Sequence, residues 1–221
     1  MKIDILISIG GACRTRYQID SFCKKNINDY VSESYYFDWL MMGGIQGVNN
    51  VISRGFEISP PNIVLFEAGG KFIPQDKISG HTFLHDFGGG WWEGDYKKAL
   101  SRLNENMEQT IHKYEYLGRK TDAILKSDCE VGLIYHGQCL DSSLNDLLKI
   151  IFHRYGRYIP VINIKESNQE ASSVDGIHTA FVDDNNSPKL GHTNEWEGWD
   201  ESWYAALTSL VTLTQKNNRP I

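Results

Sequence analysis

The second half of the chain alternates a buried strand, a helix and another buried strand, and this pattern constrains the fold more than any other feature. Residues 131–135 and 158–164 are short apolar runs, and residues 142–155 between them carry leucine and isoleucine at helical spacing. A strand, a helix and a second strand in this order build a parallel sheet with a right-handed crossover. The sequence therefore predicts an α/β protein with a mostly parallel central sheet.

The start of the chain predicts a strand, a glycine turn and a helix in direct succession. Residues 3–9 are rich in Ile and Leu and alternate little, as in a strand that is buried on both faces. Gly10 and Gly11 end this run, and apolar positions then recur at helical spacing from Cys13 to Lys25. Further helices are expected over 45–56, 95–117 and 203–213, and further strands over 63–66, 71–73, 82–87 and 177–182.

Length and charge limit the class of protein. The 221 residues suit one domain, so we expect a single layered α/β sandwich over residues 1–221 with helices flanking the sheet; a papain-like α+β fold is the alternative. A net charge of -6 provides no overall positive field for nucleic acid or an anionic membrane surface. No apolar run is long enough to cross a bilayer. We therefore expect neither nucleic acid nor a membrane as a partner.

Cysteine usage and the absence of cofactor motifs narrow the class further. Four cysteines are too few for a disulfide scaffold at this length and form no CxxC pair, which favours a reducing cytoplasm. The sequence contains no dinucleotide-binding, P-loop, metalloprotease or zinc-finger spacing. We therefore expect no cofactor and no metal ion, and the oligomeric state stays open.

Cys13 is the first candidate for chemistry because it stands where the glycine turn meets the predicted helix. The dipole and the free N–H groups of a helix N-terminus lower the pKa of a thiol, which favours a cysteine nucleophile. Backbone amides around Gly11, Ala12 and Cys13 are expected to hold an oxyanion. The alternative is a packing role, because free cysteines are often buried.

A nucleophilic cysteine needs a base, and three of the seven histidines have informative positions. His85 lies in a predicted apolar strand, where the next residue, Asp86, would point to the opposite face. His136 follows a predicted core strand, at the edge where parallel sheets place site residues, and is the rival base. His178 gives only a weak papain-like pattern. The other four are expected on the surface or on helix faces: His81, His112, His153 and His192.

Aromatic residues surround the remaining candidates. Asp38 stands between Phe37 and Trp39, and a buried carboxylate needs a hydrogen-bond partner, so Asp38 is expected to cap a backbone turn or to orient a site residue. We assign a substrate-binding role to Trp39, Trp91, Trp92 and His136. A second tryptophan-rich, acidic segment over 196–203 is an alternative ligand-binding surface, although tryptophan is also a common core residue.

Three short motifs resemble a known family in their order and spacing. They are ISIGGAC at residues 7–13, FDW at 37–39 and HDF at 85–87. They are similar to the S-L-G-x-x-C, P-F-D-W and H-D-F motifs of DUF1796, a bacterial family described as papain-like cysteine peptidases, with Ile9 and Tyr36 as mild departures. The resemblance implies Cys13 as nucleophile and His85 as base, with Asp38 or Asp86 as the orienting carboxylate.

We therefore predict a cysteine-dependent hydrolase or acyltransferase. Cys13 would attack a carbonyl of a peptide, acyl or glycan substrate, and His85 would relay the proton. The alternatives are a glycan-handling or other ligand-binding domain that uses the tryptophan-rich segment, and a sugar or phosphate transferase with His136 at the sheet edge. Cys13 is structural in both alternatives.

Overall fold

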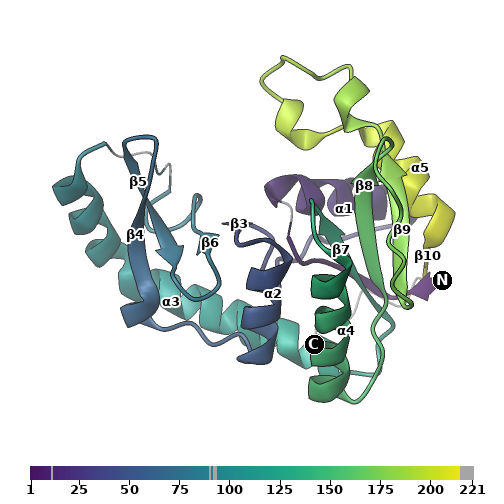
Figure 1. Ribbon diagram of the computed structural model, residues 1–221, viewed down its shortest axis with the longest axis horizontal. Helices are drawn as coiled ribbons and strands as arrows, with labels where there is room; N and C mark the ends of the chain where they lie inside the picture. The colour runs from purple at the N-terminus through teal and green to yellow at the C-terminus, as the bar shows by residue number, and fades with distance from the viewer. Residues whose placement is uncertain (11, 90, 92–93, 215–221) are drawn as a thin grey trace.

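A computed structural model describes residues 1–10, 12–89, 91 and 94–214, and it contains two four-stranded sheets of different type (Figure 1). The parallel sheet has the order β2 (Ile5–Ser8), β7 (Val131–His136), β8 (Val161–Glu166) and β9 (Ile177–Val182). The antiparallel sheet has the order β3 (Met41–Met42), β6 (His81–Thr82), β5 (Lys71–Asp76) and β4 (Ile63–Ala68). The short strands β1 (Lys2–Ile3) and β10 (Thr212–Leu213) form a separate parallel pair. The predicted α/β fold class is confirmed.

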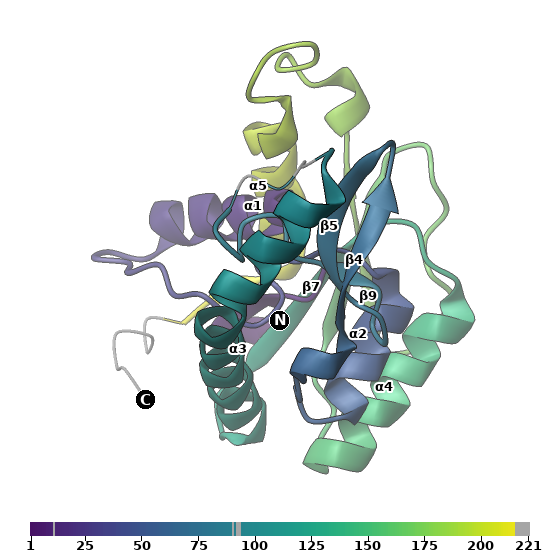
Figure 2. The ribbon, with the colours of Figure 1, turned by 90° about the vertical axis from the view of Figure 1, so that its left-hand side faces the viewer.

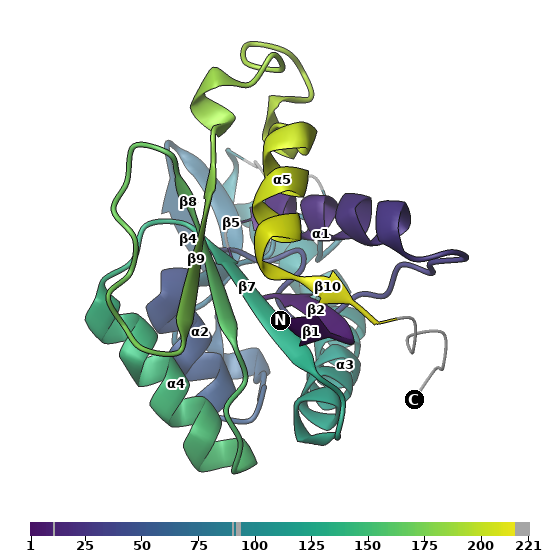
Figure 3. The same ribbon diagram turned by 90° about the vertical axis from the view of Figure 1, so that its right-hand side faces the viewer.

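Helices cover both faces of the parallel sheet (Figure 3). One face carries α1 (Ala12–Asn26) and α5 (Asp200–Leu210), and the other carries α2 (Gly44–Ser53) and α4 (Asp141–Tyr155). In β7, Ile134 packs into the core on the α1 and α5 side, whereas Leu133 packs into the core on the α2 and α4 side. Both faces are therefore apolar, as expected for a sheet that is covered twice.

The long helix α3 (Tyr96–Lys126) runs beside the antiparallel sheet (Figure 2). Asp95 caps it by accepting hydrogen bonds from the N–H groups of Lys97 and Lys98. The helix continues past the predicted end at 117 because Thr121 and Ile124 keep its apolar face buried. No helix in the described part of the chain combines the length and the apolar character needed to cross a membrane.

Two other predicted boundaries are wrong for physical reasons. The closing helix ends at Leu210 instead of residue 213, because Thr212 and Leu213 pair with β1. The predicted strand over 82–87 is reduced to His81–Thr82. After it the chain turns away from the sheet, and Phe87 has a φ of 54°, which extended backbone does not allow.

Helix α2 approaches the antiparallel sheet closely at Gly47. A Cβ atom at this position would lie 2.3 Å from the backbone oxygen of Ser79 and 2.9 Å from Cε1 of His81, a histidine that is buried and not on the surface as expected. We expect Gly47→Ala to lower the free energy of unfolding by ~1–3 kcal/mol, because overpacking outweighs the better helix propensity of alanine. Urea unfolding would measure this. Gly94→Ala, where the added Cβ meets only an ordinary contact at 3.6 Å, is the control, and equal stability of the two variants would contradict the expectation.

Candidate active site

The local fold places Cys13 at the carboxyl edge of the parallel sheet. Strand β2 ends at Ser8, and Cys13 is the second residue of α1. Gly10 has a φ of 142°, a conformation that residues with a Cβ rarely adopt. The Thr15 hydroxyl donates to the Gly10 carbonyl over 2.9 Å and ties the turn to the helix. The predicted strand, turn and helix therefore present the thiol at the edge where α/β proteins bind ligands.

His85 reaches the same place from the turn that follows β6. The Sγ atom of Cys13 lies 3.1 Å from Nε2 of His85, close enough for a hydrogen bond. Cys13 is half-buried and His85 is exposed. The ring of Trp39 meets the His85 ring edge-on, with 5.8 Å between the ring centroids. Residues from two of the short motifs, Cys13 and Trp39, thus meet the histidine of the third.

The electrostatics of the thiol differ from the expectation. Burial raises the pKa of Cys13, and the hydrogen bond from its own backbone N–H opposes this only in part. The expected net lowering by the helix N-terminus is therefore wrong for this state of the molecule. A raised pKa favours the protonated thiol, so attack by sulfur requires a base within reach, and Nε2 of His85 occupies that position.

Asp86 does not orient His85. Its buried carboxylate accepts hydrogen bonds from the Tyr114 hydroxyl over 2.7 Å and from Nζ of Lys113 over 2.5 Å, both on α3. Its carbonyl accepts from Nε1 of Trp91. The expected catalytic role of Asp86 is thus corrected to an anchor that fixes the His85 turn on α3.

This anchor can be tested by its effect on stability. We expect Asp86→Asn to lower the free energy of unfolding by ~1–3 kcal/mol, because the amide cannot accept from both Tyr114 and Lys113 as the carboxylate does. Urea unfolding monitored by circular dichroism is the measurement. Asp146→Asn, which changes an exposed carboxylate 3.8 Å from Lys149, should have almost no effect; equal losses in both variants would argue against the anchor.

Asp38 is a buried positioning residue. Its Oδ2 accepts from the Tyr35 N–H over 2.7 Å, which closes the turn before Trp39, and lies 3.5 Å from Nε of Arg16 on α1. Burial raises the pKa of Asp38 to about 7, opposed by Arg16. Within residues 1–10, 12–89, 91 and 94–214, neither Asp38 nor Asp86 is hydrogen-bonded to His85. Asp38 therefore joins the Trp39 turn to the helix that carries Cys13.

The predicted substrate-binding tryptophans separate into two groups. Trp39 is half-buried beside His85. Trp91 is 0% exposed, so its predicted substrate contact is corrected to a core role. Gly11 and Trp92 lie outside the described residues, and for Ala12 only the helical backbone is described.

His136 ends β7 as predicted, but its ring packs against Trp203, with ring centroids 5.1 Å apart. Burial lowers its pKa to about 4. Two carboxylates lie close to it: a ring nitrogen of His136, an oxygen of Glu166 and an oxygen of Asp184 are all within 4.8 Å of one another. The Arg14 guanidinium also acts on His136 and lowers its pKa further. The histidine at hydrogen-bond distance from Cys13 is His85. Sequence reasoning missed Glu166 and Asp184, although both stand at or just after the end of a predicted parallel strand.

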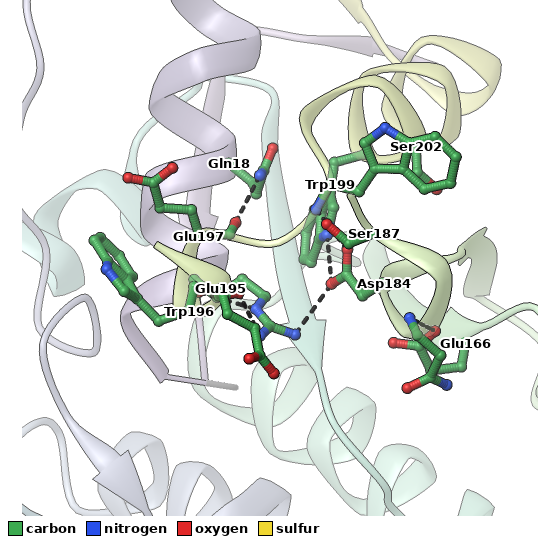
Figure 4. A network of polar contacts seen from close by, with 12 residues as sticks. Gln18, Glu166, Asp184, Ser187, Glu195, Trp196, Glu197, Trp199 and Ser202 are labelled. Carbon is green, nitrogen blue, oxygen red and sulfur yellow. Dashed lines mark hydrogen bonds and ion pairs between the residues drawn. The ribbon is translucent and has the colours of Figure 1, made fainter. Parts of the chain in front are cut away.

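Helix α1 also holds the segment 187–199 against this edge of the sheet (Figure 4). Arg14 donates from Nε to the Trp196 carbonyl over 3.0 Å and from Nη2 to the Glu195 carbonyl over 3.1 Å. Gln18 donates to the Glu197 carbonyl over 2.7 Å. Arg14, which directly follows Cys13, therefore holds this segment in place.

Comparisons with protein-family models, with curated proteins and with solved structures found no match to this chain.

Proposed function

We propose that the protein is a cysteine-dependent hydrolase or acyltransferase, with Cys13 as the nucleophile and His85 as the general base. The observation that supports this most directly is the 3.1 Å separation of Sγ and Nε2. A thiol and an imidazole at hydrogen-bond distance, at a helix N-terminus, are the arrangement that nucleophilic cysteine catalysis uses. The likeness of the three motifs to papain-like cysteine peptidases points the same way and remains a prediction.

The chemistry follows from these two groups. His85 takes the thiol proton at Nε2 while Sγ attacks the substrate carbonyl carbon, and the C–S bond forms as the carbonyl π electrons move to oxygen. The N–H groups of the first helical turn have no acceptor within the helix and are suitable donors to that oxyanion. The oxyanion collapses, the leaving group departs with the proton from His85, and a thioester remains on Cys13.

A second nucleophile then completes the reaction. Water, or an acceptor hydroxyl or amine, loses its proton to His85 and attacks the thioester carbonyl. The sulfur leaves as a thiolate and regains the proton from His85. Water as the second nucleophile makes the protein a hydrolase, and another acceptor makes it an acyltransferase.

The ligand-binding alternative has less support from the geometry. Trp203 is 0% exposed and its indole N–H is bonded to Asp184, so it offers no surface to a ligand. Trp196 is 48% exposed, but it offers a ligand only a single side chain, and its ring packs edge-on against Tyr17. The tryptophan-rich segment is therefore largely part of the framework around α1.

A covalent trap tests the proposal without a known substrate. With p-nitrophenyl acetate, we expect acetylation of Cys13 to be at least ~10²-fold faster than that of any other cysteine, because within the described part of the chain Cys13 is the one cysteine hydrogen-bonded to a histidine. Peptide mass spectrometry locates the acetyl group. The matched control is Cys139, a half-buried thiol whose pKa is also raised by burial. Cys139→Ser should leave nitrophenolate release unchanged and Cys13→Ser should abolish it; equal labelling of the two cysteines would refute the proposal.

A further inference from the structure

A cluster of one imidazole and two carboxylates lies at the carboxyl edge of the parallel sheet. His136 is the last residue of β7, Glu166 is the last residue of β8, and Asp184 follows β9 after one intervening residue. Because these strands are parallel neighbours, their carboxyl ends bring the three side chains together. We propose that His136, Glu166 and Asp184 bind a divalent transition-metal ion.

The spacing of the donor atoms suits one ion. One ring nitrogen of His136 and one oxygen from each carboxylate all lie within 4.8 Å of one another. Three donor atoms that each lie ~2.1 Å from one ion are ~3–3.6 Å apart, so each donor would move by about 1 Å to close the site.

His136 has no other polar role in the described part of the chain. Its ring packs edge-on against Trp203, and its nitrogens form neither a hydrogen bond nor an ion pair with any described residue. A partly exposed imidazole that has no hydrogen-bond partner among the described residues is available to a ligand. Two carboxylates face His136 against one guanidinium, that of Arg14, so the local charge favours a cation as this ligand.

Asp184 is held in place and still has room for a metal bond. It is 5% exposed, and it accepts from the Trp199 N–H, from Nε1 of Trp203 and from Nη1 of Arg14 (Figure 4). A carboxylate has about four lone-pair sites, so these three bonds leave about one. Such hydrogen bonds around a ligand orient it and increase its metal affinity.

Glu166 is the more available of the two carboxylates. Its side chain accepts hydrogen bonds from two backbone N–H groups, that of Asn185 over 3.4 Å and that of Asp184. Arg14 neutralises one of the two carboxylates through Asp184, so one negative charge remains for the ion to balance.

The donor set selects the class of ion. One imidazole nitrogen with two carboxylate oxygens suits Mn²⁺, Fe²⁺ or Zn²⁺ better than Ca²⁺, which prefers oxygen alone. Water or a substrate oxygen would complete the coordination, as in metal sites that keep open positions. The site does not depend on the proposed cysteine chemistry.

Titration with Mn²⁺ tests the site, because Mn²⁺ binds carboxylates and avoids the four thiols. Free Mn²⁺ is measured by electron paramagnetic resonance. We expect one saturable site in the wild type. Glu166→Gln and His136→Gln should each weaken binding by more than ~10-fold, since even the loss of a residue that only supports a ligand costs that much.

The controls change the same residue types nearby. His178→Gln, on an exposed position of β9, and Glu170→Gln, exposed after β8, should bind Mn²⁺ as the wild type does. Thermal unfolding of each variant confirms that it is folded. The proposal would be overturned if the wild type showed no saturable Mn²⁺ binding. It would also be overturned if both Glu166→Gln and His136→Gln bound Mn²⁺ with unchanged affinity. The wild-type titration tests the site even if a variant does not fold.

Discussion

The His85→Ala variant is expected to acylate Cys13 ~10²–10⁴-fold more slowly than the wild type at neutral pH. The reason is electrostatic. Burial raises the pKa of the Cys13 thiol, so little thiolate exists at neutral pH unless Nε2 of His85, 3.1 Å away, accepts the proton. The measurement is the burst of nitrophenolate from p-nitrophenyl acetate, with the acetyl group located by mass spectrometry.

The pH profile separates loss of the base from damage to the fold. Without His85, reaction follows the thiolate alone, so the rate of the variant should rise steeply toward alkaline pH and approach the wild-type rate there. Added imidazole should restore part of the activity at neutral pH. His178→Ala, which removes an exposed histidine from β9, should match the wild type throughout. A His85→Ala variant that acylates Cys13 at the wild-type rate at neutral pH would show that His85 is not the base.

Local sequence patterns predicted the part of the site around Cys13, which is formed by consecutive residues. The strand, the glycine turn and the helix around Cys13 are consecutive in the chain, and their hydrogen bonds, such as that from Thr15 to Gly10, join near neighbours. Alternation of helix and strand likewise predicted the parallel sheet. Short-range periodicity contains this information because each element forms from residues next to one another.

The rest of the site depends on contacts between distant segments. His85 was expected in a strand because 82–87 is apolar, but these residues are apolar because they pack on α3. The resemblance implied Asp38 or Asp86 as the carboxylate that orients His85, whereas the partners of Asp86 are Tyr114 and Lys113, one element further along the chain. No sequence spacing shows such pairings, because tertiary packing decides where a turn residue points.

At the carboxyl edge of the sheet, too, one residue was recognisable from local sequence and two were not. His136 was recognised because a histidine directly after an apolar strand is a local feature. Glu166 and Asp184 join it only once the order β7, β8, β9 is known, since that order makes the three strands neighbours. A metal-binding motif search examines fixed spacings within one segment, so it does not detect donors contributed by three separate strands.

The buried pair of Arg16 and Asp38 leads to the second large effect. Arg16 is 1% exposed and Asp38 0%, and Arg16 also donates to Asp20 over 2.6 Å and to Ser32 over 2.7 Å. We expect Arg16→Met to lower the free energy of unfolding at neutral pH by ~3–5 kcal/mol, because the buried Asp38 carboxyl loses its cation. It must then stay charged without a partner or take up a proton far above the pKa of an unfolded aspartate. Urea unfolding measures the loss. Lys24→Met, an exposed change in the same helix, should stay within ~0.5 kcal/mol of the wild type.

The pH dependence of the free energy of unfolding shows the contribution of Asp38. Burial raises the folded-state pKa of Asp38 from 3.8 to about 7, so between these values the folded protein binds more protons than the unfolded chain. The stability contributed by this proton is therefore complete below about pH 4 and is lost as pH rises toward 7. Asp38→Asn should remove this slope from the wild-type profile.

Charge removal provides the decisive comparison. Arg16 lowers the pKa of Asp38, so in Arg16→Met the carboxyl should stay protonated to higher pH and the destabilisation should shrink as pH falls. The double variant Arg16→Met with Asp38→Asn carries no unpaired charge and should be more stable at neutral pH than Arg16→Met alone. If the double variant is instead less stable by the sum of both single losses, Asp38 and Arg16 act independently. The link between α1 and the Trp39 turn would then depend on packing and not on this ion pair.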